Sequence, residues 1–124
     1  MELHLSRSQK SGLMGGIKFT LSVKTSLTDA ERGHVSKYKL GDTLLYEKGS
    51  EKIAAAGGFT SMLTARLMQL RVTANDLING KSIECKDILE MLAAEQQIKE
   101  SAEAFHAMLT AAAKFEGEEV IKFA

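Results

Sequence analysis

Hydrophobic and polar residues alternate strictly over residues 17–24, close to the N-terminus. One set of alternate positions is apolar, namely Ile17, Phe19, Leu21 and Val23. A period of two predicts a β-strand with one buried face. Leu3 and Leu5 give a shorter form of the same pattern. We therefore expect two antiparallel strands joined by a loop over residues 8–16.

Capping residues predict a short helix over residues 28–38. Thr28 is followed three positions later by Glu31, the spacing of a reciprocal capping box. Residues 44–46 then suit a short strand. Residues 49–58 favour at most two helical turns, because glycines stand at both ends.

Residues 59–70 are ambiguous between helix and strand. The spacing of their apolar residues fits a helix, but the threonines and the following Arg71-Val72-Thr73 favour a strand. We predict a strand that continues through Val72 and Ala74 to Asn79-Gly80. This dipeptide is typical of a tight hairpin turn, so a further strand is expected over residues 82–85.

One long helix over residues 87–115 is the clearest element of the sequence. Asp87 suits the N-cap, Glu90 completes a capping box, and Gly117 lies just past the end. Between them, one set of residues recurs alternately three and four positions apart and forms a single seam along the helix. These residues are Ile88, Met91, Glu95, Ile98, Ala102, Phe105, Leu109 and Ala112. Leu92, Met108 and Phe115 widen this seam. Residues 120–123 are then expected to return as an edge strand.

The length of the helix over residues 87–115 suggests a partner. It would span roughly 43 Å at about 1.5 Å per residue, whereas a compact domain of this size is about 35 Å across. The helix should therefore overhang its domain or bend. Because an overhanging apolar seam needs cover, we expect a homodimer through helix 87–115.

These elements predict a single α+β domain over residues 1–124. The expected order is β-β-α-β-β-β-α-β, with a mostly antiparallel sheet and both helices packed on one face. The sequence has no proline and no linker-like stretch that would mark a second domain.

Composition narrows the function only slightly. Sixteen basic and sixteen acidic residues cancel, whereas nucleic-acid-binding modules usually carry a basic excess. No stretch approaches the roughly 20 apolar residues of a membrane span. The N-terminus does not resemble a signal peptide, so we expect a cytoplasmic protein that does not bind membranes.

Glu95 and His106 are the candidate catalytic residues. Glu95 is the one charge on the helical seam, either as a buried acid or, as we favour, in a surface pair with Lys99. His106 borders the same stripe. It lies roughly 16 Å from Glu95 along the helix axis, so the two cannot form one acid–base pair within a chain.

Other chemistry-bearing residues favour structural roles. Cys85, the only cysteine, is expected to be buried. The glycine-rich loop over residues 8–16 lacks the ending of a phosphate-binding loop and precedes a strand, not a helix. The spacing of the histidines matches no metal site. We therefore predict neither a cofactor nor a metal.

Two surfaces near the N-terminus are candidate binding sites. The loop tip presents Leu13 and Met14 next to Lys10, which suits a contact with a protein partner. One face of the hairpin is polar and basic, with His4, Lys18, Thr20, Ser22 and Lys24. This face has no aromatic residue for base stacking, so nucleic-acid binding is the third-ranked interpretation.

These observations favour a non-catalytic, homo-oligomeric interaction or accessory protein. The alternative is a small enzyme or ligand-binding protein with its pocket between the sheet and the long helix. A catalytic role ranks second because no motif of reaction chemistry is present.

Overall fold

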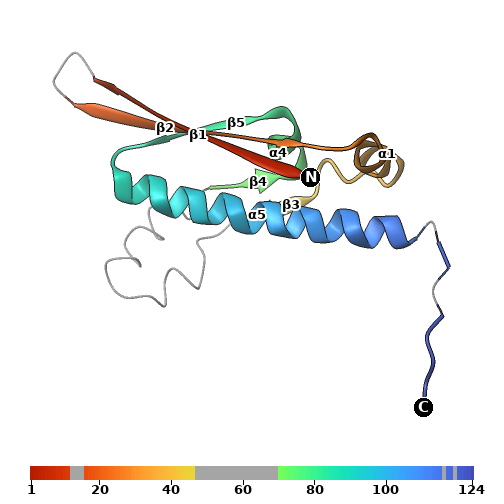
Figure 1. Cartoon of the computed structure of the whole chain (residues 1–124). Coiled ribbons are helices and arrows are strands. Elements are labelled where there is room, and N and C mark those ends of the chain that lie inside the picture. Colours follow the sequence, from red (N-terminus) through yellow and green to blue (C-terminus); the bar gives the residue numbers. More distant parts are fainter. Residues whose placement is uncertain (12–15, 47–69, 116, 119) are drawn as a thin grey trace.

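The computed structural model describes residues 1–11, 16–46, 70–115, 117–118 and 120–124. It has an α+β fold in which strands form an antiparallel sheet and a long helix runs along the molecule (Figure 1). The predicted fold class is confirmed. Three details need correction, namely the extent of the first hairpin, the strand predicted around Ala74 and the C-terminal edge strand.

Strands β1 (Glu2–Ser11) and β2 (Ile17–Ser26) form a long antiparallel hairpin. The predicted pairing is confirmed, but the strands continue further than the sequence pattern indicated. Ser11 pairs with Ile17, so residues 8–11 of the predicted loop over residues 8–16 belong to β1. The polar second half of β1 has no apolar alternation, and backbone pairing with β2 holds it in the extended form.

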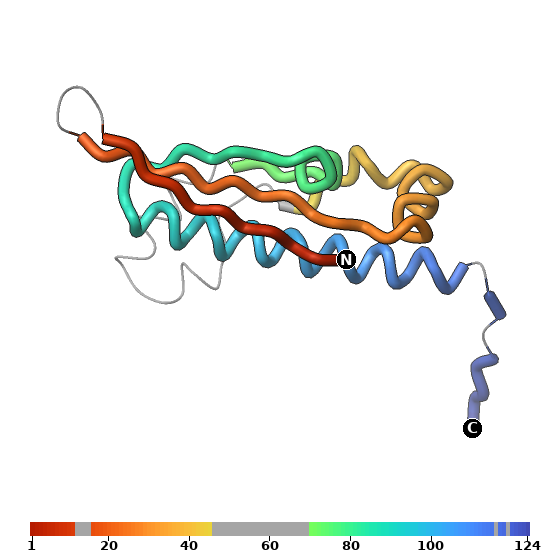
Figure 2. The backbone as a smooth tube through the Cα atoms, turned by 45° about the horizontal axis from the view of Figure 1, so that its top comes forward, coloured from red at the N-terminus to blue at the C-terminus, as the bar shows by residue number. Residues whose placement is uncertain are grey.

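Strand β5 (Lys81–Cys85) pairs antiparallel with residues 19–23 of β2 and completes a three-stranded sheet in the order β1-β2-β5. Helix α5 (Ile88–Lys114) runs lengthwise beneath this sheet, and the two views agree on the arrangement (Figures 1 and 2). Leu21 of β2 and Ile98 and Phe105 of α5 are fully buried between the layers. The opposite face of the sheet carries polar side chains.

The predicted ends of the long helix are confirmed. The Asp87 side chain accepts a hydrogen bond from the backbone N–H of Glu90 at 2.7 Å, and Phe115 is the C-cap. An aspartate at this position also favours the positive end of the helix dipole. The cap therefore fixes where the chain turns from β5 into α5.

The helical seam packs against the protein's own sheet. All its members from Met91 to Ala112 are buried, whereas the first, Ile88, is 58% exposed. Helix α1 (Asp29–Lys37) also contacts α5, and the rings of Tyr38 and Phe115 lie 6.3 Å apart. The molecule is elongated along α5, so the expected overhang does not occur. The seam is covered within one chain.

Helix α1 begins as the sequence predicted. Thr28 and Glu31 form the reciprocal capping box, with hydrogen bonds of 3.2 and 2.9 Å. Strand β3 (Leu44–Tyr46) is confirmed and pairs with β4 (Val72–Thr73) in a separate two-stranded sheet.

A short helix, α4 (Ala74–Asn79), replaces the strand predicted around Ala74. Thr73 is its N-cap and forms a capping box with Asp76, at 3.3 and 2.9 Å. Asn79-Gly80 therefore ends a helix and does not turn a hairpin. Gly80 adopts φ +99°, a conformation that glycine accepts without steric cost.

The predicted C-terminal edge strand is wrong for the residues described. Residues 120–124 have no regular secondary structure, and Val120, Ile121 and Phe123 are 74%, 64% and 90% exposed. Figure 1 shows this segment leading away from the sheet. The predictions for residues 49–58 and for residues 59–69 lie outside the described residues.

Gln97 is a buried polar residue in the middle of α5. Its side chain is fully buried, and within the described part of the chain neither amide atom has a hydrogen-bond partner. A buried amide that loses its water contacts without replacement costs about 1–3 kcal/mol. Among the described residues nothing compensates this burial, so we expect Gln97 to reduce the stability of the helix–sheet packing.

Replacing Gln97 with methionine should stabilise the protein. The two side chains have similar shapes, and methionine carries no amide to desolvate. We expect Gln97→Met to raise the free energy of unfolding by about 1 kcal/mol, measured by urea denaturation. Gln96→Met is the matched control, because Gln96 is exposed, and should change stability by less than about 0.5 kcal/mol. Equal effects of the two substitutions would contradict this explanation.

Candidate functional site

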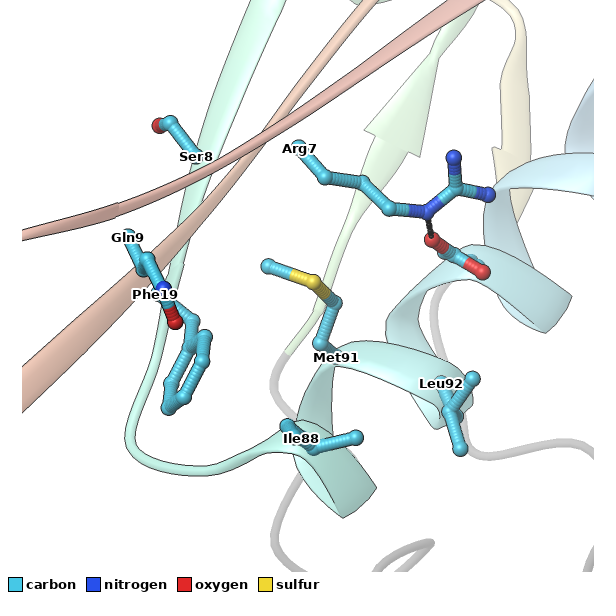
Figure 3. A pocket seen from close by; sticks show the side chains of 8 residues that line it. Arg7, Ser8, Gln9, Phe19, Ile88, Met91 and Leu92 are labelled. Atoms are coloured by element: carbon cyan, nitrogen blue, oxygen red, sulfur yellow. Dashed lines mark hydrogen bonds and ion pairs between the residues drawn. The ribbon is translucent and has the colours of Figure 1, made fainter.

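A groove opens between the first hairpin and the N-terminal turns of α5. Its volume is about 440 Å³, and Arg7, Ser8, Gln9, Phe19, Ile88, Met91, Leu92 and Glu95 line it. Four of these eight side chains are apolar, and Figure 3 shows Phe19 and Met91 on the walls of the groove, with Ile88 and Leu92 on the helix. Exposed apolar surface beside a few polar groups is typical of a binding site.

An ion pair closes one side of the groove. The Arg7 guanidinium donates from Nε to the Glu95 carboxylate, and this pair joins β1 to α5 across 88 positions of sequence (Figure 3). The Glu95 side chain is only 7% exposed, whereas the Arg7 side chain is 55% exposed. A hydrogen bond from Arg7 and the negative charge of Glu95 raise the pKa of Arg7 above its ordinary value. The positive charge of the half-exposed Arg7 side chain thus neutralises the buried Glu95 carboxylate.

The favoured interpretation of Glu95 as a surface partner of Lys99 is wrong. The structure gives Glu95 a buried position and the cation Arg7, which lies in a different element. The sequence could not indicate this pair, because Arg7 lies in the polar half of β1 where no pattern marked it as facing inward.

His106 lies apart from this groove. It is exposed and borders a separate shallow hollow with Met1, Leu3, Lys99, Ala102 and Glu103. As the spacing predicted, the two candidate catalytic residues do not share a pocket among the hollows formed by described residues. The structure thus offers no acid–base pair built from Glu95 and His106.

Cys85 is buried, as expected. It is 3% exposed, and its thiol lies 3.9 Å from the carbonyl oxygen of Ile83. Burial, together with the nearby carboxylates of Glu90, Asp87 and Glu95, raises the pKa of this thiol from 9.0 to about 11. The thiol therefore stays neutral near pH 7 and is a poor nucleophile.

The polar face of the hairpin is left uncovered by α5. His4 and Lys24 are opposite each other in the register, as are Lys10 and Lys18. Ser22 and Ser82 contact each other through their hydroxyls at 3.3 Å, and His4 lies 2.9 Å from the Ser26 hydroxyl. The predicted polar face is present. Its binding of nucleic acid stays a prediction.

The proposed loop-tip site is only partly described. Lys10 and Lys18 are exposed near the end of the hairpin, whereas Leu13 and Met14 lie outside the described residues.

Strand β1 forms an edge of the sheet. It stands at the end of the order β1-β2-β5, and no other strand of the described residues pairs with its outer side. The first turns of α5 expose Ile88 (58%) and Leu92 (55%) beside this edge, where both line the groove with Arg7 and Gln9. An open strand edge and exposed apolar side chains thus occur together.

Neither a metal site nor a membrane span is found among the described residues. Among the described residues, no group of three or more His, Cys, Asp or Glu side chains is placed to hold a metal ion. No helix in the described ranges has the length and hydrophobicity needed to cross a membrane. The chain matches no known family model, curated protein or solved structure. Evidence for a function therefore comes from the surfaces of the chain itself.

The raised pKa predicts that Cys85 reacts slowly in the folded protein. At pH 8 its thiolate fraction should be about 100-fold below that of a thiol with the ordinary value. Alkylation by iodoacetamide, followed by mass spectrometry, should be at least that much slower in buffer than in denaturing urea. Equal rates under the two conditions would contradict the buried, neutral thiol.

Removing the cation from the Arg7–Glu95 pair should destabilise the fold. Arg7→Met leaves the Glu95 carboxylate buried without its guanidinium, so the urea midpoint should fall at neutral pH. Adding Glu95→Gln to that variant removes the uncompensated charge and should restore part of the loss. If the double variant is no more stable than Arg7→Met, the pair does not compensate the buried charge.

Proposed function

We propose that this protein is a non-catalytic, homo-oligomeric interaction protein that assembles through the edge formed by β1 and the adjoining flank of α5. The observation that carries the proposal is the open edge of β1 beside exposed Ile88 and Leu92. Both side chains lie at the start of the helix, where apolar surface has no cover from the sheet. Pairing of two copies would remove this surface from water.

This proposal keeps the expected homodimer but moves its interface. The seam from Met91 to Ala112 already packs within one chain, so a helix–helix contact through that seam would require the domain to open. The flank of α5 that faces β1's open side is accessible without any rearrangement. We therefore assign the contact to this flank.

Ligand binding in the groove is the second candidate function. The groove of about 440 Å³ has apolar walls formed by Phe19 and Met91 and a charged side formed by Arg7 and Glu95. This combination suits a small amphipathic molecule with an anionic group near the Arg7 guanidinium. A ligand-binding protein of this kind would not need to be oligomeric, which separates the two proposals.

The oligomeric state tests the leading proposal. Multi-angle light scattering and sedimentation velocity should give a mass near twice the 13.5 kDa of one chain, with dissociation on dilution. Leu92→Asp should raise the dissociation constant by about tenfold or more, because a carboxylate would have to be desolvated in an apolar contact.

Ala104→Asp is the matched control. Ala104 is exposed on α5 but does not line the groove, so this substitution should leave assembly unchanged while adding the same charge. A protein that stays monomeric into the high micromolar range would rule out the leading proposal. Binding of an anionic amphiphile such as decanoate to that monomer, lost on Arg7→Met, would support the second.

A further inference from the structure

Strand β1 is unusually regular for an exposed edge. It pairs with β2 over all ten of its residues without a bulge, and the sequence contains no proline. Natural sheets commonly protect their edges with prolines, bulges or inward-pointing charges. The inward-facing charge of β1, Arg7, is already compensated by Glu95. Among the residues that the structure describes, none occupies the outer side of β1 as a strand, and this side is therefore available for pairing.

We propose that β1 of one copy pairs antiparallel with β1 of a second copy, about a two-fold axis at Ser6. This inference rests on the homo-oligomeric function proposed above and specifies how the copies meet. In this register Glu2 lies opposite the partner's Lys10, and His4 lies opposite the partner's Ser8. Two-fold symmetry forms each of these contacts twice.

The charges along β1 select this arrangement. Glu2 and Lys10 stand on the uncovered face of the sheet, and both are exposed. Opposite charges directly across two strands stabilise the pairing, and like charges there destabilise it. A parallel pair in register would place each Glu2 beside its own copy. Moving the antiparallel register by two residues in either direction separates Glu2 from the partner's Lys10.

The helices are compatible with this pairing. Helix α5 contacts β2, β3 and β5 and is joined to β1 by the Arg7–Glu95 pair. It lies beneath the sheet (Figure 1), so the proposed pairing joins the two copies at the level of the sheet, with the helices below it. The result is a continuous six-stranded antiparallel sheet with both α5 helices on the same face. Their exposed flanks, including Ile88 and Leu92, then border the new seam from opposite sides.

Charge reversal tests the register. Glu2→Lys and Lys10→Glu should each raise the dissociation constant by about tenfold or more at low salt, because two attractive contacts become repulsive. The double variant, with both reversals, should return the constant to near the original value. Glu84→Lys is the matched control, since Glu84 lies on β5, which is separated from β1 by β2. It should leave the constant within about threefold.

Disulfide trapping tests the position of the axis. In a Cys85→Ser background, Ser6→Cys should oxidise to a covalent dimer, because directly opposite residues bring their Cβ atoms to about 4.5–5.5 Å. Ser8→Cys alone should not, since its partner position is His4. Mixing the Ser8→Cys protein with the His4→Cys protein should trap the mixed dimer.

Three outcomes decide between the proposals. A monomer at all concentrations rejects the homo-oligomeric function, and this inference with it. A stable dimer whose dissociation constant is unchanged by the charge reversals, and which Ser6→Cys does not trap, rejects the β1 pairing. The homo-oligomeric function would still hold. Loss of the dimer on deletion of residues 120–124 would show that the exposed apolar C-terminal segment makes the contact, and would also overturn the β1 pairing.

Discussion

Burial of one stripe of α5 against a three-stranded sheet is the interaction on which the rest of the structure depends. A hairpin of two strands is at best marginally stable in water, and one helix has little reason to stay folded without a packed face. Here Leu21, Ile98 and Phe105 lose all contact with solvent between the two layers. Each such side chain contributes roughly 1.5–3 kcal/mol by leaving water. Sheet and helix are therefore stable only together.

The same packing determines which surfaces remain open. Helix α5 packs against β2 and β5, and β1 stands at the edge of the sheet, where no other described strand pairs with its outer side. The groove, the Arg7–Glu95 pair and the uncovered apolar turns of α5 all lie along this one side. Arg7 closes the boundary between the buried layer and water, since it neutralises a carboxylate that the helix places inside. The proposed interface follows from an asymmetric placement of the helix under the sheet.

Features with a local physical cause could be predicted from the sequence. The seam of α5 and the caps Asp87 and Thr28 depend on neighbours within a few residues, and the structure has them where the pattern indicated. The alternation in β2 correctly predicted that Leu21 and Val23 are buried, whereas Ile17 at the start of the strand is 51% exposed. A second capping box, Thr73 with Asp76, is equally local, and in the structure it prevails over the hairpin signal of Asn79-Gly80.

Features that depend on distant parts of the chain could not be predicted. Residues 6–11 of β1 are all polar, and only pairing with β2 makes them a strand. Arg7 and Glu95 meet because the sheet crosses the helix, which no local pattern encodes. The seam itself was ambiguous in the same way, because a sheet and a second helix can bury the same stripe. Tertiary packing decided between them.

The regular edge of β1 also bears on how a single copy of the chain behaves. An exposed, bulge-free strand is a template onto which any extended chain can add, and crowded conditions during synthesis favour such additions. Lys10 and Arg7 break the run of uncharged residues there, as charged residues do at the margins of aggregation-prone segments. The same open edge consequently favours unspecific association of the chain as its concentration rises.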